Sequence, residues 1–432
     1  MKELKGKDLL LIGFTLFSMF FGAGNLIFPP FLGAQAGTAT WAAMAGFALS
    51  AIGIPVLGVV AVARSGGLRD LAGRVSPKFA FVFTLLIYLS IGPCLAIPRT
   101  ASTSFEMAVT PFLGAGGQGW LPVLQFVYSL VFFAGALLLA LRPEKLTDRL
   151  GRILCPCLLA LIVILFAACL IHPPGAYGPV GGTYAAHPTV QGFVDGYQTM
   201  DTMAALAFGI IIALNVRARG VEEEAAMVRG TVKAGGIAGL LLLAVYSMLS
   251  HVGALSGGAM PGSANGAEVL TRLVHALFGG VGSVLLAAIF LIACFNVCVG
   301  LISSCGEFFH AVFPKVSYRA WALFFALVSM AIANLGLDLI LQVSVPVLGA
   351  IYPVAIVLIL LSFLPKTLGD RTRIYPWAIA VTGVFSVLFA LGDLHVPVPL
   401  VGHLPLAGIG LGWVLPAVLG TALGAVLPGR RR

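Results

Sequence analysis

Charge is scarce in this sequence of 432 residues, of which only 9% are Asp, Glu, Lys or Arg. Ordinary soluble domains carry about 25% charged residues, so this chain has too few to cover a water-facing surface. Hydrophobic residues make up 59% of it, and apolar runs recur from end to end near the length of about 20 residues that crosses a bilayer. These proportions exclude a soluble protein. They indicate one integral membrane domain, residues 1–432, that is all-α and polytopic.

The chain also has no motif that marks a nucleotide-binding or hydrolytic site. No GxxxxGK[ST], HExxH or GxSxG pattern occurs in a suitable setting, so the sequence predicts that the protein is not an enzyme. The seven cysteines lie in or at the ends of apolar runs, which is typical of packing residues and not of a disulfide framework. Without a nucleotide site, a transporter of this kind would draw its energy from an ion or proton gradient.

Twelve apolar segments are predicted, with short connections except at 172–190 and 254–280. Their approximate bounds are 9–34, 41–63, 79–107, 120–141, 150–171, 191–215, 231–253, 281–311, 317–337, 339–364, 374–393 and 405–427. Basic residues cluster at alternate ends of these segments, at 2–7, 64–78, 142–152, 217–233, 315–319, 366–373 and 430–432. These clusters hold 23 of the 25 lysine and arginine residues, which predicts that both termini are cytoplasmic. The net charge of +9 then reflects topology, and no nucleic-acid partner is predicted.

The first segment is interrupted near its middle, where residues 20–30 read FFGAGNLIFPP. Glycine costs about 1 kcal/mol in a helix interior, and each proline removes a donor to the carbonyl four residues back. We expect an unwound stretch of Gly22, Ala23, Gly24 and Asn25. Its free carbonyls suit a small cation, to which the Asn25 oxygen would add a ligand, and the amides that follow suit a carboxylate. The alternative is a kinked packing helix, since Gly and Pro are common in spanning helices.

The sixth segment carries polar residues at its middle, Thr199, Met200, Asp201 and Thr202. Asp201 would lie about 15 Å from the outer end, near the centre of a bilayer core about 30 Å thick. An intramembrane carboxylate is a candidate functional group. The alternative is an aspartate that only hydrogen-bonds a neighbouring helix end.

Two interrupted segments that enter from opposite sides are typical of transporters built from inverted repeats. This pairing predicts five helices in each half and two peripheral helices after them. Repeat one would cover about 9–171, repeat two about 191–364, and the peripheral helices about 374–427. The prediction depends on the interruptions alone, because the halves show no convincing residue-level similarity.

Further polar residues lie in the third and eighth segments. In the eighth, Ser303 and Ser304 either complete a Na⁺ site with Gly22 and Asn25 or bond back to their own helix. In the third, Arg99 and Glu106 share one helix face. We expect Arg99 to reach the outer interface and not the membrane centre, with the two residues either anchoring the helix there or forming a gating ion pair.

The sequence resembles the branched-chain amino acid:cation symporters of the BrnQ type. The resemblance rests on residues 21–30 (FGAGNLIFPP), 92–93, 98–101, 104–106, 199–202, 219–221, 345–348 and 351–353. It implies uptake of leucine, isoleucine and valine across a bacterial inner membrane, coupled to Na⁺ or, less often, to H⁺. It also implies a LeuT-like fold in which Gly22 to Asn25 and Thr199 to Thr202 are the unwound parts of helices 1 and 6, and Ser303 is a hydroxyl of the second sodium site. Ile302 stands where LeuT-like transporters often place another hydroxyl, which leaves the coupling ion open.

The residues themselves agree with a zwitterionic, aliphatic substrate. A half-helix end would take the carboxylate, and Asp201 or the freed carbonyls would take the ammonium. One methylene changes binding by only about 1–3 kcal/mol, so the sequence does not rank the three substrates, and it specifies no oligomeric state. The alternatives are another solute on the same scaffold, such as a different amino acid or a nucleobase, an intramembrane enzyme that uses Asp201 or a Cys/His pair, and a passive channel.

Overall fold

The computed structural model describes residues 4, 6–113, 119–141, 154–221, 223–263, 265–365, 373–398 and 401–427. Every regular element in these ranges is a helix, which confirms the predicted all-α fold. Among the described residues, seven helical stretches are long and apolar enough to cross a membrane, and three shorter apolar helices accompany them. The basic clusters predicted at 142–152 and 430–432, and most of the cluster at 366–373, lie outside the described residues.

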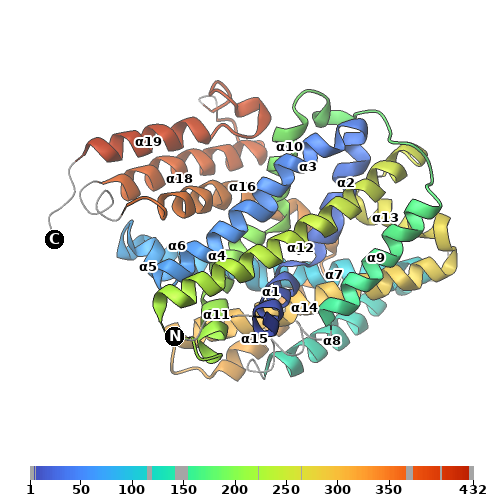
Figure 1. Cartoon of the computed structure of the whole chain (residues 1–432), viewed down its shortest axis with the longest axis horizontal. Coiled ribbons are helices and arrows are strands. Elements are labelled where there is room, and N and C mark those ends of the chain that lie inside the picture. The colour runs from blue at the N-terminus through green and yellow to red at the C-terminus, as the bar shows by residue number, and fades with distance from the viewer. Residues whose placement is uncertain are drawn as a thin grey trace.

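Each of the twelve predicted segments corresponds to a helix or to consecutive helices (Figure 1). Four segments are divided: α1 (Gly6–Phe20) with α2 (Ala23–Ala36), α3 (Thr40–Ala48) with α4 (Ile54–Ser65), α6 (Pro77–Leu89) with α7 (Ala96–Ala108), and α10 (Pro188–Asp195) with α11 (Asp201–Ala218). The other segments are α8 (Leu121–Ala140), α9 (Cys155–Ile171), α12 (Glu224–Ala259), α14 (Gly280–Val312), α15 (Tyr318–Ala333), α16 (Leu337–Leu361), α18 (Ile374–Asp393) and α19 (Val414–Val426).

Two short helices lie where connections were predicted, α5 (Leu68–Gly73) and α13 (Gly266–Phe278). The Asn265 side chain caps α13, because its Oδ1 accepts a 2.9 Å hydrogen bond from the Glu268 N–H. The helix is amphipathic and buries Leu270 and Leu273 on one face. The predicted connection 254–280 was therefore wrong in this part, because a cap and an apolar stripe within it form a helix.

Close packing of α2 on α12 brings the middle of α12 to the interruption between α1 and α2. The backbones approach through small residues: a Cβ atom at Gly33 would lie 2.0 Å from the Ser250 carbonyl oxygen, and one at Gly253 would lie 2.0 Å from that of Pro30. Small residues are typical of helix interfaces in membranes, where van der Waals contact drives association. Figure 1 shows α12 crossing the molecule beside α2 and α4.

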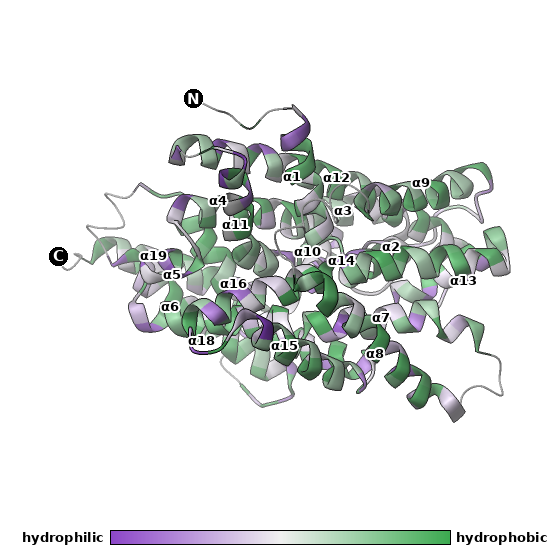
Figure 2. Cartoon of the chain, turned by 90° about the horizontal axis from the view of Figure 1, so that it is seen from below, coloured by the Kyte–Doolittle hydropathy of each residue, from purple (hydrophilic) through white to green (hydrophobic). Residues whose placement is uncertain are grey.

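The outer faces of the helices are apolar. Val123, Val127, Val131 and Leu138 of α8 are each at least half exposed, and Figure 2 shows hydrophobic residues along most of each helix. In lipid these side chains face a solvent as apolar as themselves. α18 and α19 pack against each other and, through α18, against α16, and they form one edge of the molecule in Figure 1.

Candidate functional site

The interruption of the first segment is short. α1 ends at Phe20, and Gly22 is extended, with φ −125° and ψ −154°, before α2 begins at Ala23. The helix restarts at once because Asn25 Oδ1 accepts a 3.1 Å hydrogen bond from the Gly22 N–H, and the Leu26 N–H donates to the Gly22 carbonyl at 3.2 Å. The prediction of an unwound stretch through Asn25 is therefore wrong in extent, since Ala23, Gly24 and Asn25 form the first turn of α2.

The interruption of the sixth segment is longer and lies earlier than predicted. A 3-10 turn, Gly196–Thr199, follows α10, and Met200 then takes φ 67° in the left-handed region. Asp201 and Thr202 do not belong to the unwound part, because they open α11. The Thr199 hydroxyl donates a 2.8 Å hydrogen bond to the Gly196 carbonyl and so holds the turn.

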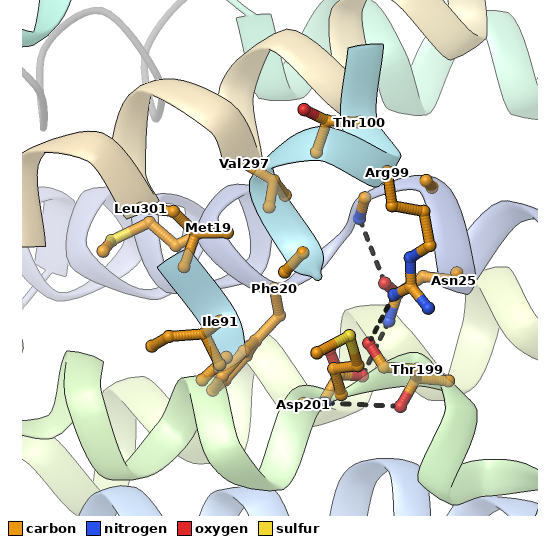
Figure 3. A pocket seen from close by; sticks show the side chains of 16 residues that line it. Met19, Phe20, Asn25, Ile91, Arg99, Thr100, Thr199, Asp201, Val297 and Leu301 are labelled. Carbon is orange, nitrogen blue, oxygen red and sulfur yellow. Dashed lines mark hydrogen bonds between the residues drawn. The ribbon is translucent and has the colours of Figure 1, made fainter. Parts of the chain in front are cut away.

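Both interruptions line the same small pocket, whose volume is about 30 Å³. Its lining residues are Met19, Phe20, Gly22, Ala23, Gly24, Asn25, Ile91, Ala96, Arg99, Thr100, Thr199, Met200, Asp201, Ala204, Val297 and Leu301. Figure 3 shows Arg99, Asn25, Thr199 and Asp201 gathered at one side, and Met19, Ile91 and Leu301 at the other. The pocket therefore has a polar end and an apolar end.

Asn25 joins the two interrupted helices through the Asp201 carboxylate. Its Nδ2 donates to Asp201 Oδ2 at 2.6 Å and to the Tyr246 hydroxyl of α12 by a short hydrogen bond. The Tyr246 hydroxyl in turn donates to the same Oδ2 at 3.0 Å. Both hydrogen bonds to this carboxylate end on one oxygen, so Oδ1 accepts none from the described residues.

Tyr246 was not singled out by the sequence reasoning. It lies in an apolar run of the seventh segment, and its side chain is fully buried. A buried phenol needs a hydrogen-bond partner, so a tyrosine in the middle of an otherwise apolar span was the available signal. Tyr352 of α16 was noted only as part of the resemblance, and it lies against the same segment: its hydroxyl accepts the Thr202 N–H at 3.3 Å.

Arg99 does not reach an interface, which corrects the expectation from its place in the third segment. The side chain is 4% exposed and lines the pocket. Its Nη1 donates to the Gln198 carbonyl at 2.9 Å, and its Nη2 donates to that of Thr199 at 3.5 Å. The guanidinium finds partners inside the protein because the turn before Met200 leaves these carbonyls outside a regular α-helix.

Glu106, predicted to share a helix face with Arg99 and either to anchor the helix or to form a gating ion pair, is half-buried and does not line the pocket. No ion pair joins Arg99 to Glu106 in the part of the chain that the structure describes. The two residues lie seven positions apart on α7, and the Arg99 guanidinium is bonded to the Gln198 and Thr199 carbonyls. The gating ion pair is therefore not formed in this conformation.

Ser303 and Ser304 are buried on α14 but are not among the residues that line the pocket. The Ser303 hydroxyl donates to the Val299 carbonyl of its own helix at 2.9 Å. The α14 residue at the first interruption is Val297, since a Cβ atom at Gly22 would lie 2.8 Å from its Cγ2. The sodium role of Gly22, Asn25, Ser303 and Ser304 stays a prediction, with Asn25 Oδ1 already accepting one hydrogen bond.

Two solved transporter structures resemble the fold across nearly its whole length. The inward-facing conformation of Mhp1 aligns with a TM-score of 0.59 at 14% identity and covers 96% of this chain and 90% of that one. MhsT in complex with L-phenylalanine aligns with a TM-score of 0.58 at 14% identity and covers 98% of both chains. At this identity the likeness concerns the fold alone, and it confirms the predicted LeuT-like architecture of about twelve spanning helices.

Similarity in sequence is much stronger to curated bacterial proteins. The branched-chain amino acid permease BraB of Bacillus subtilis is 41% identical over 98% of this chain and 96% of its own. The branched-chain amino acid transport system 2 carrier protein of Pseudomonas aeruginosa is 43% identical over 99% and 97%. The branched-chain amino acid permease BrnQ of Escherichia coli is 40% identical over 98% and 96%.

A family model described as "branched-chain amino acid transport protein" matches residues 5–430. The match spans both interrupted helices and every other helix of the described chain. It agrees with the resemblance found in the motifs and with a multi-pass membrane transport protein. The chain belongs to the family of branched-chain amino acid transport proteins.

Proposed function

We propose that this protein imports leucine, isoleucine and valine across a bacterial inner membrane by symport with a cation. The observation that carries the proposal is the pocket between the two interrupted helices, where a buried Arg99 and a buried Asp201 face an apolar end. A zwitterion with an aliphatic side chain matches this distribution of charge and apolar surface. The names of the relatives point to the same substrates.

Transport through this site requires the pocket to enlarge. A cavity of about 30 Å³ holds about two water molecules, whereas leucine has nine non-hydrogen atoms. Met19, Phe20 and Leu301 line the pocket and are the side chains that would have to move. Such a rearrangement fits alternating access, in which the repeats proposed at about 9–171 and 191–364 rock around a central site.

Sodium is the coupling ion that we favour, with H⁺ as the alternative. Ser303 and Ser304 lie on the helix that packs against α1, where a Cβ atom at Gly300 would contact the Met19 side chain at 3.6 Å. The Ser303 oxygen keeps lone pairs for a cation while it donates to Val299. Ile302, which is buried, adds no ligand. For H⁺ coupling, Asp201 would be the group that takes the proton.

Uptake into proteoliposomes tests substrate and ion together. An inward Na⁺ gradient should drive accumulation of labelled leucine above equilibrium, and an inward H⁺ gradient at equal Na⁺ should not. Unlabelled valine and isoleucine should compete, whereas phenylalanine and uracil should not. Accumulation of leucine with an H⁺ gradient alone would show that H⁺, and not Na⁺, is the coupling ion. A failure of valine and isoleucine to compete would refute the substrate assignment.

The sodium ligand has a matched control in the chain. Ser303→Ala should raise the Na⁺ concentration for half-maximal leucine uptake about tenfold, since one of the few oxygen ligands is lost. Ser386→Ala on α18 is the control, because Ser386 is also buried and donates to a carbonyl four residues back, that of Thr382 at 2.8 Å. The same Na⁺ dependence in both variants would remove Ser303 from the site.

We also propose that both termini lie in the cytoplasm, from the distribution of 23 basic residues. Reporter enzymes fused to the C-terminus test this orientation. A cytoplasmic reporter such as β-galactosidase should be active there, and a periplasmic alkaline phosphatase should be inactive. The opposite result would place the termini outside.

A further inference from the structure

Arg99 and Asp201 stand apart from all other charged groups of the described chain. They are the only charged side chains that the described part of the protein buries, at 4% and 1% exposure. They come from different helices, α7 and α11, and line one pocket. Their charges are opposite, yet no ion pair within 4.0 Å joins them among the described residues. Two buried opposite charges that do not meet leave room for a ligand that carries both charges itself.

The guanidinium of Arg99 has donors to spare. It carries five N–H groups, and the two hydrogen bonds to the Gln198 and Thr199 carbonyls each use one. These bonds fix the plane of the group at the polar end of the pocket. Gly24 also lies against the group, because a Cβ atom there would lie 2.9 Å from Arg99 Nη2 and 3.2 Å from the Gln198 carbonyl oxygen. The position is therefore built around a guanidinium, whose remaining donors fit a carboxylate in a fork.

Asp201 has an acceptor to spare. The Asn25 amide donates to its Oδ2 at 2.6 Å, and the Tyr246 hydroxyl donates to the same oxygen at 3.0 Å. Its Oδ1 accepts no hydrogen bond from the described residues, although the carboxylate lines the pocket. An ammonium group supplies three donors for such an oxygen.

We propose that Arg99 binds the carboxylate of the amino-acid substrate while Asp201 Oδ1 binds its ammonium. This inference rests on the proposed function. It assigns the substrate carboxylate to the Arg99 side chain, whereas the sequence predicted only the amides at the start of α2. The α2 N-terminus then assists Arg99, and the aliphatic side chain points toward Met19, Ile91 and Leu301 (Figure 3). Recognition of both charges selects α-amino acids against amines and carboxylic acids of the same shape.

Ligands that lack one charge test the two residues separately. Leucinol keeps the ammonium of leucine but has no carboxylate, and 4-methylpentanoate keeps the carboxylate but has no ammonium. Binding to the purified full-length protein in detergent, at one fixed Na⁺ concentration, is measured by calorimetry. The wild type should bind leucine at least about 30-fold more tightly than either analogue, because each analogue leaves one buried charge without a partner.

The decisive readout is the preference for leucine over leucinol. Arg99→Gln should weaken leucine binding about 30-fold or more and leave leucinol within about threefold, so that the preference is lost. Asp201→Asn should weaken leucine in the same way and leave 4-methylpentanoate within about threefold. An arginine that only supports the fold would, when replaced, weaken leucine and leucinol by the same factor, and this result would overturn the proposal.

Arg99→Lys serves where Arg99→Gln does not fold, as judged by size-exclusion profile and melting temperature. Lysine keeps the charge but not the fork, so leucine should weaken about tenfold with leucinol unchanged. Equal weakening of both ligands again refutes the assignment. Failure of the wild type to bind or transport leucine would instead refute the proposed function itself. A wild type that transports leucine, with an Arg99→Gln variant that retains the leucine preference, would refute this inference alone.

Discussion

The first and sixth helices are both interrupted at the pocket, but the two interruptions are built differently. In the first, the chain leaves the helix only at Phe21 and Gly22, and Gly22 is extended at a negative φ of −125°. In the sixth, the 3-10 turn Gly196–Thr199 leads to Met200 at φ 67°, which L-residues rarely adopt. The first interruption therefore depends on glycines, which have no side chain, and the second depends on the strained backbone of Met200.

The neighbours of each interruption explain why it persists. At the first, Val297 and Arg99 occupy the space in which Cβ atoms of Gly22 and Gly24 would lie. At the second, a left-handed residue other than glycine costs about 1–3 kcal/mol and needs surrounding contacts to hold it. Burial of the Met200 side chain and the hydrogen bonds of Arg99 to two carbonyls before it supply these contacts. Arg99 thus takes part in both interruptions.

Gly24→Ala should have the largest effect, because its Cβ atom meets a guanidinium held by two hydrogen bonds and the backbone of the turn before Met200. It would lie 2.9 Å from Arg99 Nη2 and 3.2 Å from the Gln198 carbonyl oxygen. Overpacking typically costs about 1–3 kcal/mol, so leucine uptake in proteoliposomes should fall about 10- to 100-fold. Gly236→Ala on α12 is the matched control, since nothing lies within 4 Å of a Cβ atom there. Wild-type uptake by Gly24→Ala would show that the guanidinium is not confined.

The existence of the first interruption was predictable from sequence, but its length was not. Two glycines and two prolines within residues 20–30 mark a weak helix. The Asn25 side chain, expected to coordinate a cation, also caps the helix through the Gly22 N–H. Local propensity does not distinguish these roles, because the cap forms only when the chain turns at Gly22. Pro29 and Pro30 lie within α2, which continues through them.

Gly22→Ala should have a smaller effect, and one that a second substitution relieves. The added Cβ atom would lie 2.8 Å from Val297 Cγ2 and 3.2 Å from its Cβ, both parts of one side chain. Leucine uptake should fall about three- to tenfold, within the cost of overpacking. Val297→Ala removes the γ-methyl groups, so the double variant should recover uptake beyond the sum of the single effects. A double variant no better than Gly22→Ala would mean that the backbone at Gly22, and not the space beside it, is what requires glycine.

The second interruption and the position of Arg99 required the structure. Nothing about Met200 as a residue predicts a left-handed conformation, and the polar neighbours Thr199 and Asp201 marked only the region. The position of Arg99 in the third segment predicted that it lies at an interface, because an arginine in a spanning helix usually extends its charged group into water. Its partners are carbonyls of a turn about 100 residues away in the chain, so no local pattern indicates them. The same holds for Tyr246 and its hydrogen bond to Asp201.

The smallest effect should distinguish Met200→Ile from Met200→Leu. Both replacements are apolar and of similar volume, so each keeps the buried contacts of Met200, which is 2% exposed. Isoleucine is branched at Cβ and tolerates φ 67° less well than leucine, by about 1 kcal/mol. The apparent melting temperature in detergent should therefore be about 1–3 °C lower for the isoleucine variant. Equal melting temperatures would mean that the backbone at Met200 is not strained. The two interruptions would then no longer differ in this way, with the first lacking room for Cβ atoms and the second holding a left-handed residue.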